Sequence, residues 1–158
     1  MDTESQRMIT HLIRTQRIAA LGTLREGAPF VSMVQFALSP DFSTFFIHIS
    51  RLAHHTRNIV GDPRVGLMIA GTDTGKQDPL TLARVSIQGV AVEVPPTGSE
   101  YEEIESAYLI KYPQSAFNFQ LGDFSFFSIR VCMARYVAGF GKIFDLTVED
   151  FISSSLEM

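Results

Sequence analysis

The stretch IHISRLAHHTRNIVGDPR, residues 47–64, decides the fold that we expect for this chain of 158 residues. It begins as a β-strand, changes character at Ser50, and continues as a short helix with a polar face. Gly61 and Pro63 should end this helix, because glycine readily takes the left-handed cap conformation and proline cannot continue a helix. Within residues 50–58, seven side chains can donate hydrogen bonds or carry positive charge, namely Ser50, Arg51, His54, His55, Thr56, Arg57 and Asn58.

A strand that turns into a helix through polar residues favours anion binding. The first N–H groups of a helix lack intrahelical partners, and the helix dipole adds positive potential at the same end. The segment therefore predicts a phosphate site. The alternative is an ordinary surface helix, with Ser50 as its N-cap and the basic side chains on a solvated face.

Length and composition indicate a single domain over residues 1–158. Hydrophobic residues make up 46% of the chain and charged residues 19%, which indicates an apolar surface and hence a subunit interface. The net charge of −4 excludes the overall positive field typical of nucleic-acid-binding proteins. With Cys132 as its single cysteine, the chain has no intrachain disulfide and no multi-cysteine metal site. Because neither a membrane span nor a secretory signal is evident, we expect a cytoplasmic protein without a membrane partner.

Hydrophobic periodicity predicts an α+β fold that is mainly β with flanking helices. Apolar residues at helical spacing predict an N-terminal helix over about residues 5–17. Alternation and turn signals predict six strands, at residues 18–24, 30–38, 44–49, 65–70, 82–94 and 124–138. A helix should end near Lys111, and Thr147 should cap a short C-terminal helix. The short connections make the strands antiparallel, and closure into a barrel over about residues 18–145 would remove exposed edges, although an open sheet is the alternative.

The segment SRLAHHTRNIVGDPR resembles the phosphate-binding strand and helix of the pyridoxamine 5'-phosphate oxidase-like, FMN-binding split-barrel family. It is most similar to the branch that includes haem-utilisation proteins, whose members carry Ser-x-Leu-Ala-x-His-Thr-x-Asn followed by Asp-Pro-Arg. The likeness extends from about Met8 to Phe144. It implies a six-stranded antiparallel split β-barrel, FMN as the cofactor, and a homodimer with the cofactor between its subunits. The Phe-rich stretch Phe124–Ile129 adds to the expectation of an interface.

The resemblance also implies where the cofactor binds. The phosphate would lie at the helix start, and the backbone of residues 33–35 would hold the edge of the flavin ring. Arg84 stands where the oxidases carry a glutamine that reaches the flavin, and it projects to the same side of its strand as Ser86 and Gln88. A row of solvated residues on the barrel exterior is the alternative for this strand. The cofactor-binding residues that we expect are Ser32, Met33, Val34, Ser50, Arg51, His54, His55, Thr56, Asn58, Arg84 and Gln88.

The chain departs from the oxidases at basic positions. His54 and His55 replace an Arg-Lys pair, and Ser32 and Ala37 replace an Arg and a Lys on the second strand. Because histidine is only partly charged at neutral pH, two readings of function stay open. One is an FMN-dependent oxidoreductase acting on a small-molecule substrate. The other is a non-catalytic ligand- or haem-binding protein that has lost flavin chemistry. The sequence identifies no catalytic residue and no metal site, and His48 is interpreted as structural.

Overall fold

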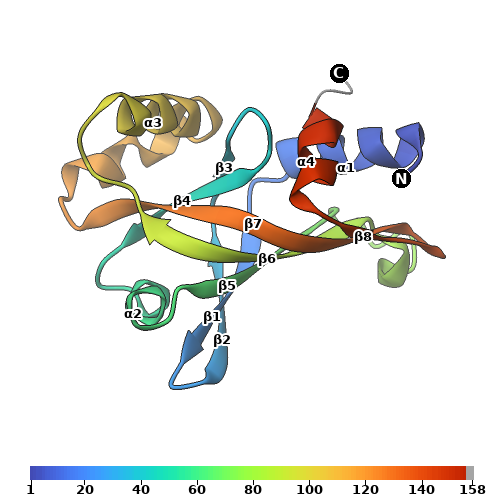
Figure 1. Ribbon diagram of the computed structural model, residues 1–158, viewed down its shortest axis with the longest axis horizontal. Helices are drawn as coiled ribbons and strands as arrows, with labels where there is room; N and C mark the ends of the chain where they lie inside the picture. The colour runs from blue at the N-terminus through green and yellow to red at the C-terminus, as the bar shows by residue number, and fades with distance from the viewer. Residues whose placement is uncertain (156–158) are drawn as a thin grey trace.

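An eight-stranded antiparallel sheet forms the body of the computed structural model, which describes residues 1–155 (Figure 1). The elements follow in the order α1 (Thr3–Thr15), β1 (Ala19–Arg25), β2 (Ala28–Val34), β3 (Ala37–Leu38), β4 (Thr44–Ser50), α2 (His54–Gly61), β5 (Arg64–Ala70), η1 (Pro79–Thr81), β6 (Arg84–Glu93), α3 (Ser99–Lys111), η2 (Pro113–Gln120), β7 (Phe124–Gly139), β8 (Lys142–Leu146) and α4 (Val148–Ser155). The two η elements are short 3₁₀ helices.

The strand order explains how the sheet becomes a split barrel. It runs β2-β1-β5-β6-β7-β4-β3, with β8 paired to β7 beside this path. The two ends of the path, β2 and β3, are separated in sequence by only Gln35 and Phe36. The sheet therefore curls so that its two edge strands, β2 and β3, follow each other in one bent segment of the chain. Within residues 1–155, however, no hydrogen-bonded ladder joins β2 to β4, and this gap is the split in the barrel. The expected antiparallel split barrel with flanking helices is confirmed.

Two local features give eight strands instead of the expected six. The strand expected at residues 30–38 is interrupted because the N–H and C=O of Phe36 pair with the hydroxyl of Tyr112, at 3.2 and 2.8 Å, instead of with another strand. The glycines at positions 139 and 141, with φ of 144° and 82°, form a tight hairpin turn that leads into β8. Sequence periodicity missed β8 because it is short and four of its five residues are not buried.

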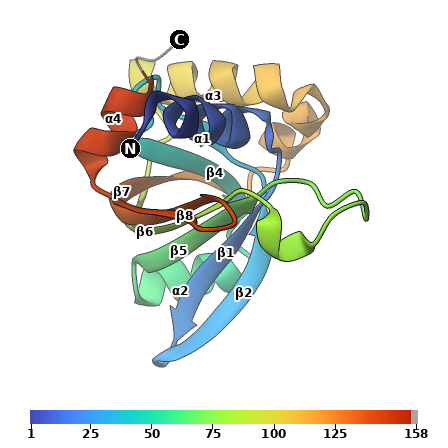
Figure 2. The same ribbon diagram turned by 90° about the vertical axis from the view of Figure 1, so that its right-hand side faces the viewer.

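Helices α1 and α4 cover one side of the sheet, and α2 lies on another side (Figure 2). Helix α1 begins at an N-cap formed by Asp2, whose carboxylate accepts a hydrogen bond of 2.9 Å from Ser5 N. It contributes Ile9, Leu12 and Ile13 to the main core, together with inward-facing residues of seven strands and Phe151 of α4. As predicted, Thr147 caps α4, in a reciprocal arrangement with Asp150.

A second apolar cluster fixes α3 against β4 and β7. Its buried members are Ala37, Phe46, Val94, Ile104, Tyr108, Tyr112 and Phe126. Phe126 is fully buried in this cluster, and the neighbouring Phe127 belongs to the main core. The Phe-rich stretch of β7 is therefore interior to one chain, so it gives no support to a subunit interface, contrary to our interpretation of the sequence.

Candidate functional site

A cavity of about 480 Å³ lies where the barrel is split. The end of β2, the end of β4, the start of α2 and the segment from α3 to η2 all contribute to its wall. Four of the residues that we expected to bind a cofactor line it, namely Met33, Val34, Ser50 and His55. The structure thus brings the expected ring-edge segment and the start of the anion-binding segment to one place. We call this space the split cavity.

Ser50 ends β4 and does not cap the helix. Its hydroxyl donates to the Asp123 carboxylate at 2.7 Å and accepts from Leu52 N at 3.1 Å. Helix α2 begins four residues later, at His54, and its N-cap residue, Ala53, provides no side-chain cap. Gly61 also differs from expectation, because the C-cap is Asp62 in an extended conformation instead of a left-handed glycine. The turn between strand and helix is thus longer than the sequence suggested.

Arg51 lies beside the ends of β6 and β7. Its Nε donates to Ser125 Oγ at 3.1 Å, and its Nη2 lies 3.2 Å from the carboxylate of Glu93. The Arg51 side chain is 60% exposed, so this ion pair is screened by solvent. The guanidinium does not line the split cavity. Among the expected cofactor-binding residues at positions 50–58, Arg51 is the one arginine, and a protein carboxylate already partners it.

Thr56 and Asn58 are buried, and their side chains hold α2 in place. The Thr56 hydroxyl donates to the backbone carbonyl of Ser50. The Asn58 amide donates to Thr23 Oγ1 at 3.0 Å, which ties the helix to β1. These two donors are occupied by the protein itself. Their polar character in the sequence therefore has a structural explanation, whether or not an anion also binds nearby.

The adjacent histidines of α2 face different surroundings. His55 Nδ1 lies 2.9 Å from Ser32 Oγ on β2, and burial lowers the pKa of His55 below its usual value. His54 is exposed and packs loosely beside Phe30, with 6.1 Å between ring centroids. The lowered pKa makes His55 mostly neutral at neutral pH, so it offers an anion little charge unless the anion itself raises that pKa.

Arg84 and Gln88 lie apart from residues 50–58, the segment that we expected to bind an anion. The alternation along β6 buries Val85 and Ile87 and leaves Ser86 and Gln88 exposed, which agrees with the alternative of a solvated row. Arg84 donates to the carbonyls of residues 80 and 82 at 3.0 and 3.1 Å, and so it closes the turn that contains η1. Neither residue lines the split cavity.

Gln88 belongs instead to the outer face of the sheet. One row of residues crosses five strands, each residue paired with the next on the neighbouring strand: Val31, Gly22, Gly66, Gln88 and Met133. Two hollows of about 540 and 430 Å³ adjoin there and share Gly22, Gly66 and Gln88. We call them together the glycine trough. The sequence could not reveal it, because two glycines 44 positions apart become neighbours only once the strand register is known.

Exposed apolar side chains surround the glycine trough. On the same face the exposed fractions are 68% for Val31, 66% for Met33, 56% for Val92, 46% for Met133 and 40% for Met68. Such a contiguous apolar face on a sheet is typical of a binding surface or a subunit interface. It meets the expectation of an apolar surface, and of these five residues only Met33 was singled out from the sequence.

His48, which we interpreted from the sequence as structural, is the more buried of the two histidines that line the split cavity. His48 is 7% exposed, and its ring stacks on Phe119 with 4.1 Å between centroids. Its Nδ1 is fully buried and has no hydrogen-bond partner within residues 1–155. Burial lowers the pKa of His48 to about 4. The available signal was its position two residues before Ser50, which places both side chains on the same face of β4.

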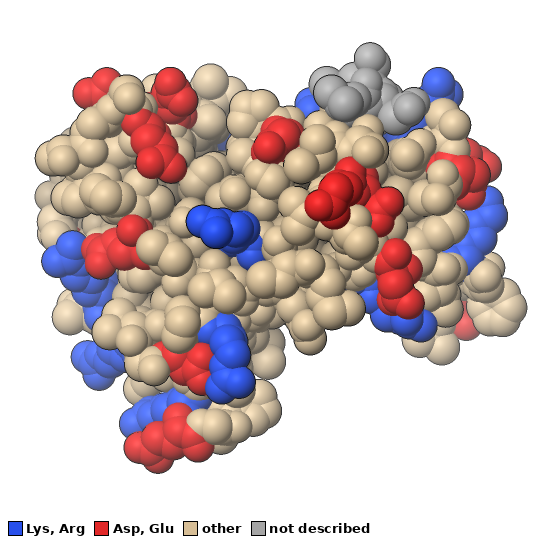
Figure 3. All heavy atoms as spheres, in the orientation of Figure 1, with Lys and Arg blue, Asp and Glu red and all other residues tan. Residues whose placement is uncertain are grey.

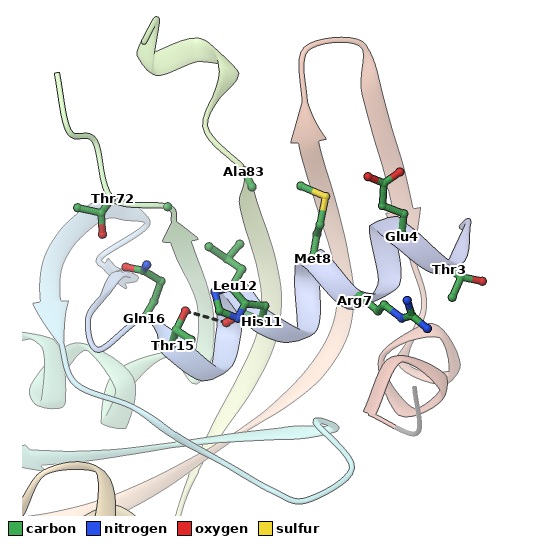
Figure 4. Close-up of a pocket in the computed structure, with 11 residues that line it drawn as sticks. Thr3, Glu4, Arg7, Met8, His11, Leu12, Thr15, Gln16, Thr72 and Ala83 are labelled. Carbon is green, nitrogen blue, oxygen red and sulfur yellow. Dashed lines mark hydrogen bonds between the residues drawn. The ribbon is translucent and has the colours of Figure 1, made fainter. Parts of the chain in front are cut away.

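Two other surfaces of residues 1–155 show no cluster of potential catalytic or ligand-binding side chains from several elements. A groove of about 610 Å³ runs along α1, from which Met8, His11 and Gln16 project (Figure 4), but the other elements contribute only Gly71, Thr72 and Ala83 to it. Acidic and basic side chains are interspersed on the face seen in Figure 3. Within residues 1–155, no helix has the length and apolar character needed to span a membrane.

Comparison with known proteins places these features in a family. The sequence profile described as pyridoxamine 5'-phosphate oxidase matches residues 6–138. The chain is 38% identical over 119 residues to the chloroplastic haem oxygenase HOZ of Arabidopsis thaliana, a match that covers 75% of this chain and 35% of that protein. It is 23% identical over 128 residues to the haem oxygenase HutZ of Vibrio cholerae, covering 80% of this chain and 72% of that protein.

A solved structure agrees with this assignment. The haem-binding protein of Mycobacterium smegmatis superposes with a TM-score of 0.83 at 29% sequence identity, over 94% of this chain and 60% of that chain. The present chain thus spans 35% and 60% of the lengths of the plant and mycobacterial relatives. Because the family profile covers most of the barrel, this chain belongs to the pyridoxamine 5'-phosphate oxidase family.

Proposed function

We propose that this protein binds haem. The observation that carries the proposal is the 38% identity to a haem oxygenase over three quarters of this chain. The relatives from Vibrio cholerae and Mycobacterium smegmatis are also named for haem. The proposal concerns haem binding and leaves oxygenation aside, because this chain spans only 35% of the length of the plant enzyme. It favours the non-catalytic, haem-binding reading of the sequence over the FMN-dependent oxidoreductase.

The chemistry of the anion segment supports haem over FMN. Ser32 and Ala37 stand where the oxidases have fixed positive charges, and burial lowers the pKa of His55. Arg51 already faces the carboxylate of Glu93. A doubly charged phosphate at this place would find few charged donors, and charge-assisted bonds are the ones that hold phosphates strongly.

The glycine trough offers a surface suited to a porphyrin. A porphyrin is planar and apolar on both faces, and it carries two propionates at one edge. Gly22 and Gly66 provide the flat floor, and Val31, Met68 and Met133 provide apolar walls. Arg64 and Arg135 line the two hollows and are 72% and 56% exposed. They pair with Asp62 at 2.6 Å and with Asp145 at 2.9 Å, so a propionate would have to share or displace these carboxylates. We propose that haem lies in this trough, between two copies of the chain.

A titration with haemin tests this proposal. Wild-type protein should give a Soret band that saturates with haemin. Gly66→Leu should weaken the binding roughly tenfold, the factor that corresponds to about 1.4 kcal/mol of lost apolar contact. The new side chain fills the trough without backbone strain, since the nearest atom to its Cβ is Ile87 O at 3.6 Å. Gly61→Leu is the matched control, because no atom lies within 4 Å of a Cβ at that position. If Gly66→Leu and Gly61→Leu bound haemin with equal affinity, the proposal that haem lies in the glycine trough would be wrong.

FMN is the second candidate, favoured by one specific observation. The split cavity unites Met33, Val34, Ser50 and His55, which the family resemblance assigned to the flavin ring and phosphate. In that case His55→Ala should weaken FMN binding roughly tenfold, because His55 lines the split cavity and would donate a hydrogen bond to the phosphate. Riboflavin, which lacks the phosphate, should bind both proteins equally. Absence of FMN binding to wild-type protein would leave haem as the cofactor proposal.

A further inference from the structure

Two basic side chains, at the end of α3 and just beyond the end of α1, share one aromatic ring. Lys111 is the last residue of α3, and its Nζ lies 3.9 Å from the centroid of the Phe36 ring and 5.5 Å from that of Tyr112. Arg17 follows α1 by two residues, and its Cζ lies 5.3 Å from the same Tyr112 centroid. Because aromatic faces attract cations, both side chains are held against the protein surface.

Neither cation has an acidic partner in the part of the chain that the structure describes. The salt bridges within residues 1–155 involve four other basic residues, namely Arg51, Arg64, Arg135 and Lys142. On α3, the positions one turn before Lys111 are Ala107 and Tyr108, so no acidic residue of the same helix pairs with it. The N–H groups of both cations therefore remain for water or for a ligand.

The positive charge of Lys111 is poorly compensated by its surroundings. The side chain is half-buried, and this burial, together with the neighbouring charge of Arg17, lowers the pKa of Lys111 to about 8. Burial also raises the pKa values of Tyr108 and Tyr112, so these hydroxyls stay neutral and provide no counter-charge. A negative charge placed beside the ammonium would relieve both causes of the shift.

Helix dipoles account for only part of this arrangement. The negative end of a helix dipole favours a cation in the last turn, and Arg14 of α1 and Lys111 of α3 occupy such positions. Arg17 lies beyond the end of α1 and adds a charge that capping does not require. Two like charges brought to one ring without an acid between them are typical of a surface that binds an anion.

We propose that Lys111 and Arg17 bind an oxyanion with two negative charges, of the phosphate or sulfate class, between the end of α3 and the segment that joins α1 to β1. The guanidinium suits two oxygens of such a group at once, and the ammonium can donate to a third. Neither residue lines the split cavity or the glycine trough, so this site is separate from those considered for FMN and haem.

A bound anion would add a second link where the chain already has one. The Tyr112 hydroxyl lies 2.7 Å from the carbonyl oxygen of Arg17, which joins segments 95 positions apart in the sequence. An oxyanion held by Arg17 and Lys111 would connect the same two segments through their side chains. Its binding should therefore stabilise the contact between α3 and the start of β1.

Sulfate is the probe for the wild-type protein, because its two charges do not change over the pH range in which lysine titrates. The chain has three lysines, Lys76, Lys111 and Lys142, whose pKa values can be followed separately by NMR. Sodium sulfate should raise the pKa of Lys111 by roughly one unit relative to sodium chloride of equal ionic strength, since sulfate binds the protonated amine roughly tenfold more tightly. Sulfate affinity should accordingly fall as the pH rises through 8.

The other two lysines are internal controls in the same spectra. Lys76 is exposed in the loop between β5 and η1, and Lys142 lies 3.8 Å from the carboxylate of Glu4. Their pKa values should be the same in sulfate and in chloride. Phenyl phosphate, titrated in the same way, distinguishes the two sources of such an anion. Tighter binding than that of inorganic phosphate assigns the site to an organic ester, and equal binding assigns it to the free ion.

Substitutions test the two cations one at a time. Lys111→Met keeps an unbranched chain to pack on Phe36 and removes the charge, so sulfate affinity measured by calorimetry should fall roughly tenfold. Arg17→Gln should have a similar effect. Lys76→Met is the matched control, because it removes one lysine charge from an exposed loop, and it should leave sulfate affinity unchanged.

Three results would overturn the proposal. These are a Lys111 pKa that is equal in sulfate and in chloride, an equal rise of the pKa at Lys76 and Lys111, and equal sulfate affinities of Lys111→Met and Lys76→Met. The first two are measured on the wild-type protein, so they decide the question even if a variant fails to fold.

Discussion

At the scale of single residues, His48 governs how stability depends on pH. Its pKa is about 4 in the folded protein against 6.5 when exposed. Between these values the unfolded chain binds a proton that the folded protein does not. The free energy of unfolding should therefore fall as the pH drops from about 6.5 to 4, by up to roughly 3 kcal/mol, because each pKa unit corresponds to about 1.4 kcal/mol.

Urea denaturation at pH 7, 5.5 and 4.5 measures this effect. His48→Phe should be markedly less sensitive to pH across that interval than the wild type. The carboxylates of Asp2, Asp41 and Asp62 have lowered pKa values, so the stability that they contribute is lost only below their usual value of 3.8. An unchanged pH dependence in His48→Phe would show that the imidazole is not held neutral by burial.

Residue roles were predictable only where a side chain has local partners. Capping of α4 by Thr147 depends on a residue three positions away, and it was predicted correctly. The Ser50 hydroxyl pairs with Asp123, 73 positions away, and the Gln35 amide pairs with residues 73 and 80 positions away. Such contacts depend on tertiary structure, so neither the bond of Ser50 nor the position of Gln35 in the cavity wall could be predicted from the sequence.

At the scale of elements, the side chain of Tyr112, the C-cap residue of α3, stabilises the backbone at the split in the barrel. The Tyr112 hydroxyl accepts from Phe36 N at 3.2 Å, and it lies within hydrogen-bond distance of the carbonyls of Phe36, at 2.8 Å, and Arg17, at 2.7 Å. It binds the backbone at Phe36, where β2 gives way to β3, beside the place where no ladder joins β2 to β4. Tyr112 is fully buried, so water cannot take over these bonds.

Tyr112→Phe should destabilise the protein by roughly 1–3 kcal/mol, because it leaves the buried backbone groups of Phe36 unpaired. For a chain of this size the melting temperature should fall by roughly 3–10 °C. Tyr101→Phe in the same helix is the control, since within residues 1–155 no hydrogen bond involves the Tyr101 hydroxyl. Differential scanning calorimetry would show the difference, and equal melting temperatures for the two variants would contradict this role of Tyr112.

Most helices and strands could be predicted from their periodicity and caps, and two boundaries show where this reasoning fails. The break at Phe36 depends on a tyrosine 76 positions away, which no local pattern reveals. Helix α2 starts at His54 because Ser50 is drawn into a bond with Asp123, which directly precedes the neighbouring strand β7. In both cases a tertiary hydrogen bond outweighs local propensity.

At the scale of the whole molecule, the apolar outer face predicts a homodimer. Val31, Met33 and Met133 are between 46% and 68% exposed on one continuous sheet surface. Burying such a face against a second copy would give a symmetric interface, on the order of 2,000 Å² in total for a stable dimer.

Sedimentation equilibrium at micromolar concentration measures the dimer directly. Val31→Lys should shift the protein towards the 17.6 kDa monomer, because it places a charge at the centre of the interface. Ile110→Lys is the control, since Ile110 is 84% exposed on α3, away from this face, and should leave the dimer intact. A wild-type protein that sediments as a monomer would contradict the proposed assembly.

The choice between haem and FMN is the central claim, and a competition measures it most directly. Purified protein would be incubated with equal concentrations of haemin and FMN and then passed over a desalting column. The absorbance spectrum of the protein fraction identifies what it retains. We predict an intense Soret band without the flavin band near roughly 450 nm, because the chain lacks the fixed charges of the phosphate site and offers an apolar trough. A protein fraction that retains flavin and shows no Soret band would contradict the proposal.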